Sequence, residues 1–163
     1  MKKQLRDLIC ASLLVFPALL IGKTAGLSIG SGWAKPGWTV DLPITLSGGA
    51  QPTALEWSFG YSPDITKVTV VAGISTKAAG KTLSCSATKC LIFGGKNTTL
   101  ADGEVAVATF QIAAKPSSAT IPIAIKSVVA AEPDGNSIPA SGGTGTITLP
   151  TPAMLKFFAA WVD

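Results

Sequence analysis

The sequence predicts an all-β domain in which two antiparallel sheets pack face to face as a β-sandwich. Apolar and polar residues alternate with period two in several segments, which is the pattern of half-buried strands. Clusters of Gly, Pro, Asn and Asp separate these segments, and no segment inside the domain has a convincing helical period. The composition agrees, because Gly (17) and Pro (11) are frequent and charged residues make up only 13% of the 163 residues. A chain of this length suffices for one domain with a hydrophobic core.

The first strand is expected at residues 39–46, where Leu42 and Ile44 fall on the apolar face. Pro43 lies between them and has no N–H group to donate. We therefore expect this strand to lie at a sheet edge or to be irregular at Pro43.

The second strand, residues 54–61, has large side chains on one face and small or polar ones on the other. Leu55, Trp57, Phe59 and Tyr61 form the large face, and Ala54, Glu56, Ser58 and Gly60 form the other. Such a row of aromatic side chains marks a core strand. We predict that Trp57, Phe59 and Tyr61 are buried against Leu42, Ile44, Phe110 and Ile112 of the neighbouring strands.

Further short strands are expected along the rest of the domain, to give eight or nine in all. They cover residues 67–71, 91–93, 104–112, 121–129 and 144–149. Strands of this number and spacing favour the two-sheet sandwich over other all-β folds.

The N-terminal segment has the order of a secretion signal. Residues 1–7 are basic, residues 8–21 are apolar, and small residues follow at 22–26. The apolar run is shorter than the roughly 20 residues of a membrane span. An uncleaved anchor is the alternative, because Lys23 interrupts the small-residue cleavage site near Ala25. We therefore expect a signal peptide at 1–26, a secreted, periplasmic or cell-surface protein, and no stable membrane span after processing.

The rest of the chain divides into two parts. The sandwich is expected at residues 27–149, and residues 150–163 are a linker or C-terminal tail that begins with two prolines.

Cys85 and Cys90 remain after removal of the signal and flank a turn-prone stretch of four residues. In an exported protein such a pair indicates a disulfide, with the two Cα atoms within about 7 Å of each other. A metal site is the alternative, but the sequence has no His and no further thiol in the processed chain to complete it. We expect no metal and no cofactor.

The net charge of +4 comes mostly from the signal segment. Without residues 1–26 the chain keeps nine basic and eight acidic residues, and no basic run is interleaved with aromatic residues. This distribution makes nucleic acid an unsuitable partner.

Catalytic groups are scarce as well. The processed chain lacks His and Arg, which removes common bases and partners of nucleophiles, and its carboxylates lie in turns or singly on strand faces. Glycoside hydrolysis would need two carboxylates that face one cleft. Acidic turns at residues 102–104 and 134–136 offer too few oxygen ligands for a specific Ca²⁺ site, and their residue types favour tight turns in any case. We therefore expect a protein that is not an enzyme.

Trp33 and Trp38 flank a loop rich in Gly and Pro. They could plug one end of the sandwich or stack on the sugar rings of a polysaccharide. We favour the plug, because a sugar platform also needs neighbouring polar groups that the sequence does not place.

The order of four motifs resembles the cohesin domain. The motifs are GWTVDLPITLSGG at 37–49, ALEWSFGYSP at 54–63, DGEVAVATFQI at 102–112 and EPDGNSI at 132–138. The resemblance covers residues 27–149 approximately. It implies a jelly-roll sandwich of about nine strands that has no catalytic activity and binds a dockerin domain on a partner protein, often a polysaccharide-degrading enzyme.

The resemblance also implies a partner-binding surface. The dockerin-facing strand of the family often has a polar residue one place before the aromatic residue, and Glu56 holds that position, with Ser58 on the same face. Ala54 and Gly94 would permit close approach, and Ile92 would add an apolar contact if it points outward. The chain departs from the cellulosome scaffold proteins in its single domain, its lack of repeats and its cysteine pair. A carbohydrate-binding module of the same architecture and a surface or adhesion spacer domain therefore remain alternatives.

Overall fold

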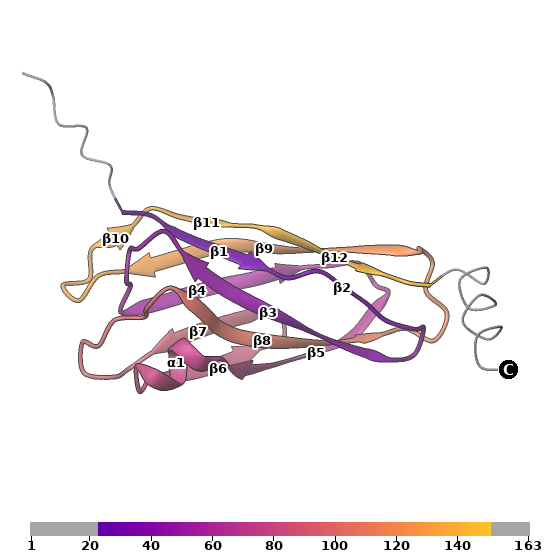
Figure 1. The fold of residues 1–163 in the computed structure, drawn as a ribbon, viewed down its shortest axis with the longest axis horizontal. Helices are drawn as coiled ribbons and strands as arrows, with labels where there is room; N and C mark the ends of the chain where they lie inside the picture. The colour runs from indigo at the N-terminus through magenta and orange to yellow at the C-terminus, as the bar shows by residue number, and fades with distance from the viewer. Residues whose placement is uncertain (1–22, 151–163) are drawn as a thin grey trace, which may run out of the picture.

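The computed structural model of the protein describes residues 23–150, and two β-sheets packed face to face account for most of them (Figure 1). The five-stranded sheet has the order β11 (Ala140–Gly142), β1 (Ala25–Ile29), β3 (Thr39–Ser47), β8 (Gly103–Ile112) and β5 (Ile65–Ala72). The seven-stranded sheet has the order β2 (Gly32–Trp33), β12 (Thr144–Thr148), β9 (Thr120–Ala131), β4 (Ala54–Gly60), β7 (Lys89–Phe93) and β6 (Thr82–Ser86), and β10 (Ser137–Ile138) pairs with β9. The predicted jelly-roll β-sandwich is confirmed.

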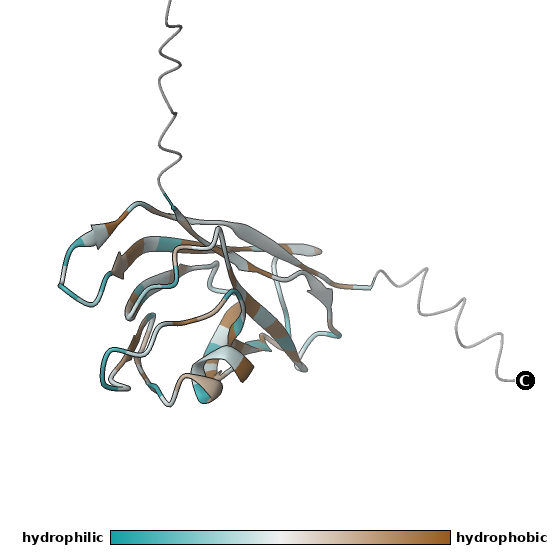
Figure 2. Ribbon diagram, turned by 60° about the vertical axis from the view of Figure 1, so that its left-hand side comes forward, coloured by the Kyte–Doolittle hydropathy of each residue, from teal (hydrophilic) through white to brown (hydrophobic). Residues whose placement is uncertain are grey.

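The core lies between the two sheets and contains the residues that alternation predicts. Trp57, Leu42, Ile44, Phe110 and Ile112 are buried, with at most 1% of each side chain exposed. The Phe59 ring packs edge-on against both Trp57 and Phe110, with ring centroids 6.4 and 5.8 Å apart respectively. Tyr61 is only half-buried and packs against the edge of this cluster. Figure 2 shows the apolar stretches on the strands and the most hydrophilic stretches largely in the turns.

Pro43 lies inside a sheet, because β3 pairs with β1 on one side and with β8 on the other. The Pro43 carbonyl accepts a hydrogen bond from the Gly30 N–H at 2.9 Å. In such a ladder the N and C=O of one residue face the same neighbour, so the missing donor of Pro43 faces the end of β1. Beyond Ile29 the chain leaves this sheet, and the first half of β3 becomes an edge. The strand is thus an edge only on one side of Pro43, and it also has a register shift at Ile44/Thr45.

The crossing between the sheets requires a glycine. After β1 the chain passes to β2, which pairs with β12 in the other sheet. A Cβ atom on Gly145 of β12 would collide with the backbone carbonyl of Gly30 at the crossing point. Only glycine permits this close approach.

The fold has two features that the sequence analysis did not predict, namely the start of the first strand and a short helix. Strand β1 begins at Ala25, so the sandwich includes two residues that we assigned to the signal segment, and the residues before 23 lie outside the described part. A short helix, α1 (Ile74–Ala78), connects β5 with β6 and is tied to β8 by a hydrogen bond from Thr76 Oγ1 to the Val105 carbonyl at 2.7 Å. Within residues 23–150, no helix has the length and apolar character to cross a membrane.

Candidate partner-binding face

Outward side chains of β4, β7, β6 and the adjoining part of β9 form one continuous surface. The strand register arranges them in rows: Val129, Glu56, Leu91 and Ser84 form one row, and Lys126, Ser58, Lys89 and Ser86 form the next. We call this surface, together with Ala54 and Phe93, the β4–β7 face. It includes Glu56, Ser58 and Ala54, which were expected to share one side of their strand.

Glu56 lies at the centre of the β4–β7 face. Its carboxylate contacts the ammonium group of Lys89 at 2.8 Å, with 29% of the Glu56 side chain and 57% of the Lys89 side chain exposed. The two residues are diagonal neighbours on adjacent strands, a position from which long side chains reach each other. An exposed pair of this kind stabilises a fold by only about 0–1 kcal/mol. Its consequence for binding is that Lys89 already neutralises the carboxylate.

Ser58 lies in the next row of the face. Its hydroxyl donates a hydrogen bond to the backbone carbonyl of Lys126 on β9 at 3.2 Å. The Ser58 hydroxyl is therefore occupied within the sheet, and it retains only its acceptor capacity for an external donor.

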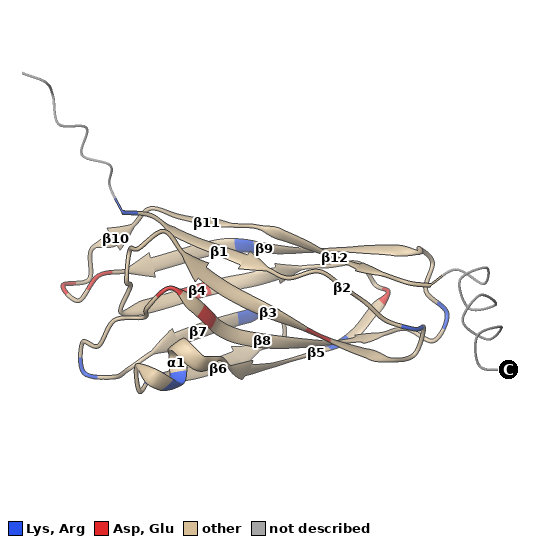
Figure 3. Ribbon diagram, in the orientation of Figure 1, with Lys and Arg blue, Asp and Glu red and all other residues tan. Residues whose placement is uncertain are grey.

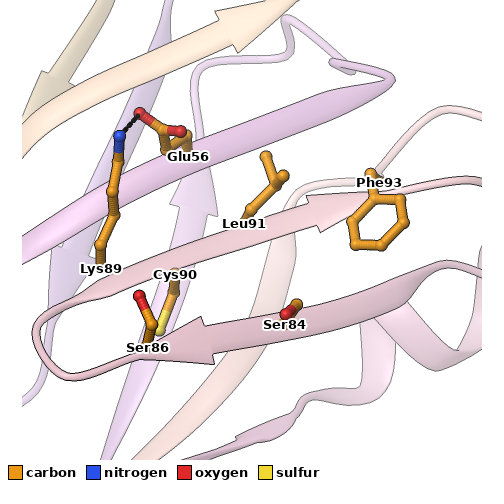
Figure 4. Close-up of a pocket in the computed structure, with 7 residues that line it drawn as sticks. All are labelled: Glu56, Ser84, Ser86, Lys89, Cys90, Leu91 and Phe93. Atoms are coloured by element: carbon orange, nitrogen blue, oxygen red, sulfur yellow. Dashed lines mark ion pairs between the residues drawn. The ribbon is translucent and has the colours of Figure 1, made fainter.

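Apolar side chains surround the ion pair. Val129 is 52% exposed, Phe93 42% and Leu91 36%. Leu91 and Phe93 point away from the core beside an open depression of about 360 Å³ (Figure 4). The depression is lined by Glu56, Ser84, Ser86, Lys89, Cys90, Leu91 and Phe93. The face thus combines exposed apolar side chains with an ion pair and serine hydroxyls, a mixture of groups that is common in protein–protein interfaces.

The prediction that Ile92 points outward and adds an apolar contact is wrong. Ile92 is fully buried, because the register sets it opposite Leu55, which faces the core. Its neighbours Leu91 and Phe93 take the outward positions instead. The sequence offered one signal for this arrangement, since Lys89 shares the phase of Leu91 and Phe93 and a lysine belongs on the solvent side.

Gly94 lies at the rim of the β4–β7 face and not in its centre. It follows β7 with a φ of +83°, a left-handed conformation that favours glycine irrespective of any partner. The Gly94 carbonyl accepts a hydrogen bond from Lys81 Nζ at 2.7 Å. Burial lowers the pKa of Lys81.

The expected disulfide joins Cys85 of β6 to Cys90 of β7, with their Cα atoms 4.1 Å apart. The two residues are direct cross-strand partners. Cys90 is buried and Cys85 is exposed, so the bridge ties the edge strand β6 to the core side of β7. It therefore holds the part of the face that carries Ser84 and Ser86.

The prediction that Trp33 and Trp38 plug the end of the sandwich is wrong. Trp33 is 72% exposed and Trp38 is 63% exposed. Lys35 Nζ lies 5.2 Å from the centre of the Trp38 ring, in a cation–π arrangement. The end of the core is closed instead by smaller residues, which include Ala34 and Leu149.

The carboxylates of the described residues are scattered and mostly serve the fold (Figure 3). Asp102 accepts hydrogen bonds from the Gly49 N–H, and Asp134 accepts them from Asn136 within its own turn. Asp64 accepts hydrogen bonds from Ser117, chiefly from its backbone N–H, and these hold the pKa of Asp64 below its ordinary value of 3.8. No group of three or more His, Cys, Asp or Glu residues that could hold a metal ion occurs between residues 23 and 150.

The fold and the β4–β7 face together define a β-sandwich with a surface suited to protein docking. No family model matches the sequence, and no curated protein matches it. Solved structures of cohesin domains do resemble it. The sixth cohesin of scaffoldin B from Acetivibrio cellulolyticus, solved with a dockerin, is 20% identical, with a TM-score of 0.62 over 78% of this chain and 99% of that chain.

Two further structures extend the comparison. A non-cellulosomal cohesin from Archaeoglobus fulgidus is 14% identical, with a TM-score of 0.64 over 83% of this chain and 97% of its own. The OlpC cohesin from Clostridium thermocellum, solved with a dockerin, is 18% identical, with a TM-score of 0.60 over 78% of this chain and 96% of its own. The chain therefore has the cohesin fold.

Proposed function

We propose that this chain is an exported, non-catalytic binding module that docks a dockerin-type domain of a partner protein, such as a polysaccharide-degrading enzyme, on its β4–β7 face. The observation that carries the proposal is the group of exposed apolar side chains, Val129, Leu91 and Phe93, around the Glu56–Lys89 ion pair. The fold it shares with cohesins solved in complex with dockerins supports the same partner class. The Cys85–Cys90 disulfide supports an oxidising, extracytoplasmic location.

The chemistry of the face fits a helical partner. A sheet face free of covering helices is a rigid platform, and its apolar side chains would insert between the residues of a helix packed across it. Glu56 and Lys89 lie beside this apolar patch, where a docked partner would remove both from water. Each charge then contributes to binding only if the partner supplies a hydrogen-bonding group for it.

The first step of the test is to capture a dockerin-bearing protein from the secreted proteins of the host organism, with the processed chain as bait. The dockerin module of that protein is then produced separately. Calorimetric titration of this dockerin against the wild-type chain and the Glu56→Lys variant should show weaker binding of the variant by about 2 kcal/mol or more. The new lysine would leave Lys89 without its partner charge and would place two like charges at the centre of the interface. Folding should be nearly unchanged, because Glu56 is partly exposed and lies outside the core.

A matched pair of apolar variants locates the binding face. Phe93→Ala removes an exposed side chain from the β4–β7 face, and Val71→Ala removes one from β5 in the opposite sheet. Loss of affinity for Phe93→Ala alone is the expected result. Equal affinities of wild type, Glu56→Lys and Phe93→Ala would place the docking site elsewhere, and failure to capture any dockerin would favour the spacer role.

A further inference from the structure

Two exposed tryptophans stand at one end of the sandwich on backbone that is firmly held. The Ala34 N–H donates to the Thr148 carbonyl at 3.2 Å, and the Gly37 N–H donates to the Ala113 carbonyl at 3.0 Å. The exposure of Trp33 and Trp38 is therefore a property of a fixed surface. Indole side chains are among the largest apolar groups in proteins, and each carries one N–H donor. Two solvent-exposed tryptophans five positions apart in the sequence indicate a surface that binds a partner.

Two lysines lie close to the tryptophans, and the exposed carboxylate of Asp41, three residues after Trp38, accepts a hydrogen bond from Thr109 Oγ1. Lys35 lies over the Trp38 ring, and Lys115 is exposed on the adjoining loop after Ala113. Asp64 contacts the same loop, but its carboxylate is turned inward and bound by Ser117. Solvent at this end thus meets indole rings and ammonium groups.

The chain leaves the sandwich at the same end. Thr148, the last residue of β12, pairs with Trp33. The described part of the chain ends two residues later, at the same end of the sandwich (Figure 1). The next residues, 151–163, have the sequence TPAMLKFFAAWVD, which is mostly apolar and carries one lysine and one aspartate. An apolar segment whose one lysine and one aspartate balance in charge therefore continues directly from the tryptophan-bearing end.

We propose that this end of the sandwich, with Trp33, Trp38, Lys35 and Lys115, rests on the surface of a lipid membrane that contains anionic headgroups. Tryptophan is enriched at the boundary between headgroups and acyl chains, where its ring is in an apolar layer and its N–H remains in a polar one. Lysines at the same level attract anionic lipids, each by about fivefold in affinity. This inference does not depend on the proposed dockerin partner.

A sugar ligand fits the same tryptophans less well. Recognition of sugar hydroxyls needs free polar side chains beside the stacking rings. Gln111 Nε2 donates to the Gly37 carbonyl at 2.8 Å, and Ser31 Oγ accepts from the Thr146 N–H at 3.0 Å. Gln111 and Ser31 are thus both engaged by the backbone. Lys35 also occupies one face of the Trp38 ring, where a sugar ring would stack.

Sedimentation of the processed chain, with residues 151–163 retained, with lipid vesicles tests the proposal. We expect the wild-type chain to bind vesicles made of equal parts phosphatidylcholine and phosphatidylglycerol. The Trp33→Ser/Trp38→Ser double variant should bind about tenfold less, because it loses most of the apolar area at this end. Phe93→Ser is the matched control, since it removes an exposed aromatic side chain from the β4–β7 face, and it should bind like wild type. Near-UV circular dichroism of the buried Trp57 verifies folding.

The lysines provide a second, independent readout. Lys35→Glu/Lys115→Glu should reduce binding to the anionic vesicles and leave binding to pure phosphatidylcholine vesicles nearly unchanged. Equal vesicle binding by wild type and the double tryptophan variant would overturn the proposal, since residues 151–163 would then suffice. Absence of vesicle binding together with tryptophan-dependent retention on insoluble polysaccharide would overturn it in favour of a sugar site.

Discussion

Trp57 is the largest fully buried side chain of the core, and it contacts Phe59 edge to face. Its indole Nε1 has no hydrogen-bond partner among the described residues. We expect Trp57→Ala to lower the free energy of unfolding by about 3–5 kcal/mol, because it removes an entire aromatic side chain from a packed site. Trp57→Phe should cost clearly less, because it keeps an aromatic ring and removes the unpaired N–H group. Chemical denaturation of both variants measures the difference, and equal losses would contradict this account of the site.

Asp64 makes stability depend on pH. Hydrogen bonds from Ser117 favour the ionised carboxylate in the folded protein, so the pKa of Asp64 is lower there than the ordinary 3.8 of an unfolded chain. The stabilisation is therefore complete above about pH 5 and is lost as the pH falls below 3.8 toward the lowered folded pKa. Asp64→Asn should lower the free energy of unfolding most at neutral pH, and the gap to wild type should narrow on acidification. Denaturation curves between neutral and acidic pH test this, and a gap that does not change with pH would exclude the mechanism.

At the scale of single elements, the β6–β7 hairpin depends on its disulfide. Strand β6 is the outer strand of its sheet, and its side chains are mostly exposed, so few buried contacts hold it. A bridge that closes so short a loop stabilises the fold by about 2 kcal/mol. We expect the Cys85→Ser/Cys90→Ser variant to lose about that much. Hydrogen exchange should accelerate chiefly in β6, and uniform acceleration through both sheets would show that the bridge acts on the whole fold.

The strands that alternation could predict are those with one polar face. The burial of β4 alternates without interruption, and its aromatic face is in the core as expected. Strand β7 reads Cys-Leu-Ile-Phe after Lys89, so hydropathy alone does not tell which face is inward. Its pairing with Leu55 decides the matter, and Ile92 is buried in consequence. The outward positions of Leu91 and Phe93 on the β4–β7 face were missed for this reason.

A bulge explains why Val129 could not be predicted. Ile121, Ile123 and Ile125 of β9 face the core, and simple alternation would send Val129 inward as well. Ser127 has a φ of +49°, and the pairing with β4 shifts by one residue there. This bulge reverses the phase of the strand, and Val129 faces out beside Glu56. A local change of this kind leaves no mark in the hydropathy pattern.

At the scale of the whole molecule, the two proposed surfaces lie at different places on the sandwich. Trp33 pairs with Thr148, which pairs with Thr120 at the beginning of β9. Glu56 pairs with Val129, near the end of the same strand. The nine residue-to-residue steps from Thr120 to Val129 correspond to roughly 30 Å of strand. A membrane at the tryptophan-bearing end would therefore leave the β4–β7 face accessible to a partner.

This separation predicts that the two activities are energetically independent. Effects at sites farther than about 10 Å apart with no shared contacts add. The Trp33→Ser/Trp38→Ser variant should keep the wild-type affinity for a dockerin partner, and Glu56→Lys should keep the wild-type affinity for anionic vesicles. The combined variant should lose as much dockerin affinity as Glu56→Lys alone and as much vesicle affinity as the double tryptophan variant alone. Titrations in solution and on vesicles, with all variants at equal concentration, provide the comparison.

The contradicting outcome is a dockerin affinity that changes when the wild-type chain is bound to vesicles. It would mean that the membrane covers part of the β4–β7 face or tilts it toward the lipid. The tryptophans and Glu56 would then belong to one extended surface.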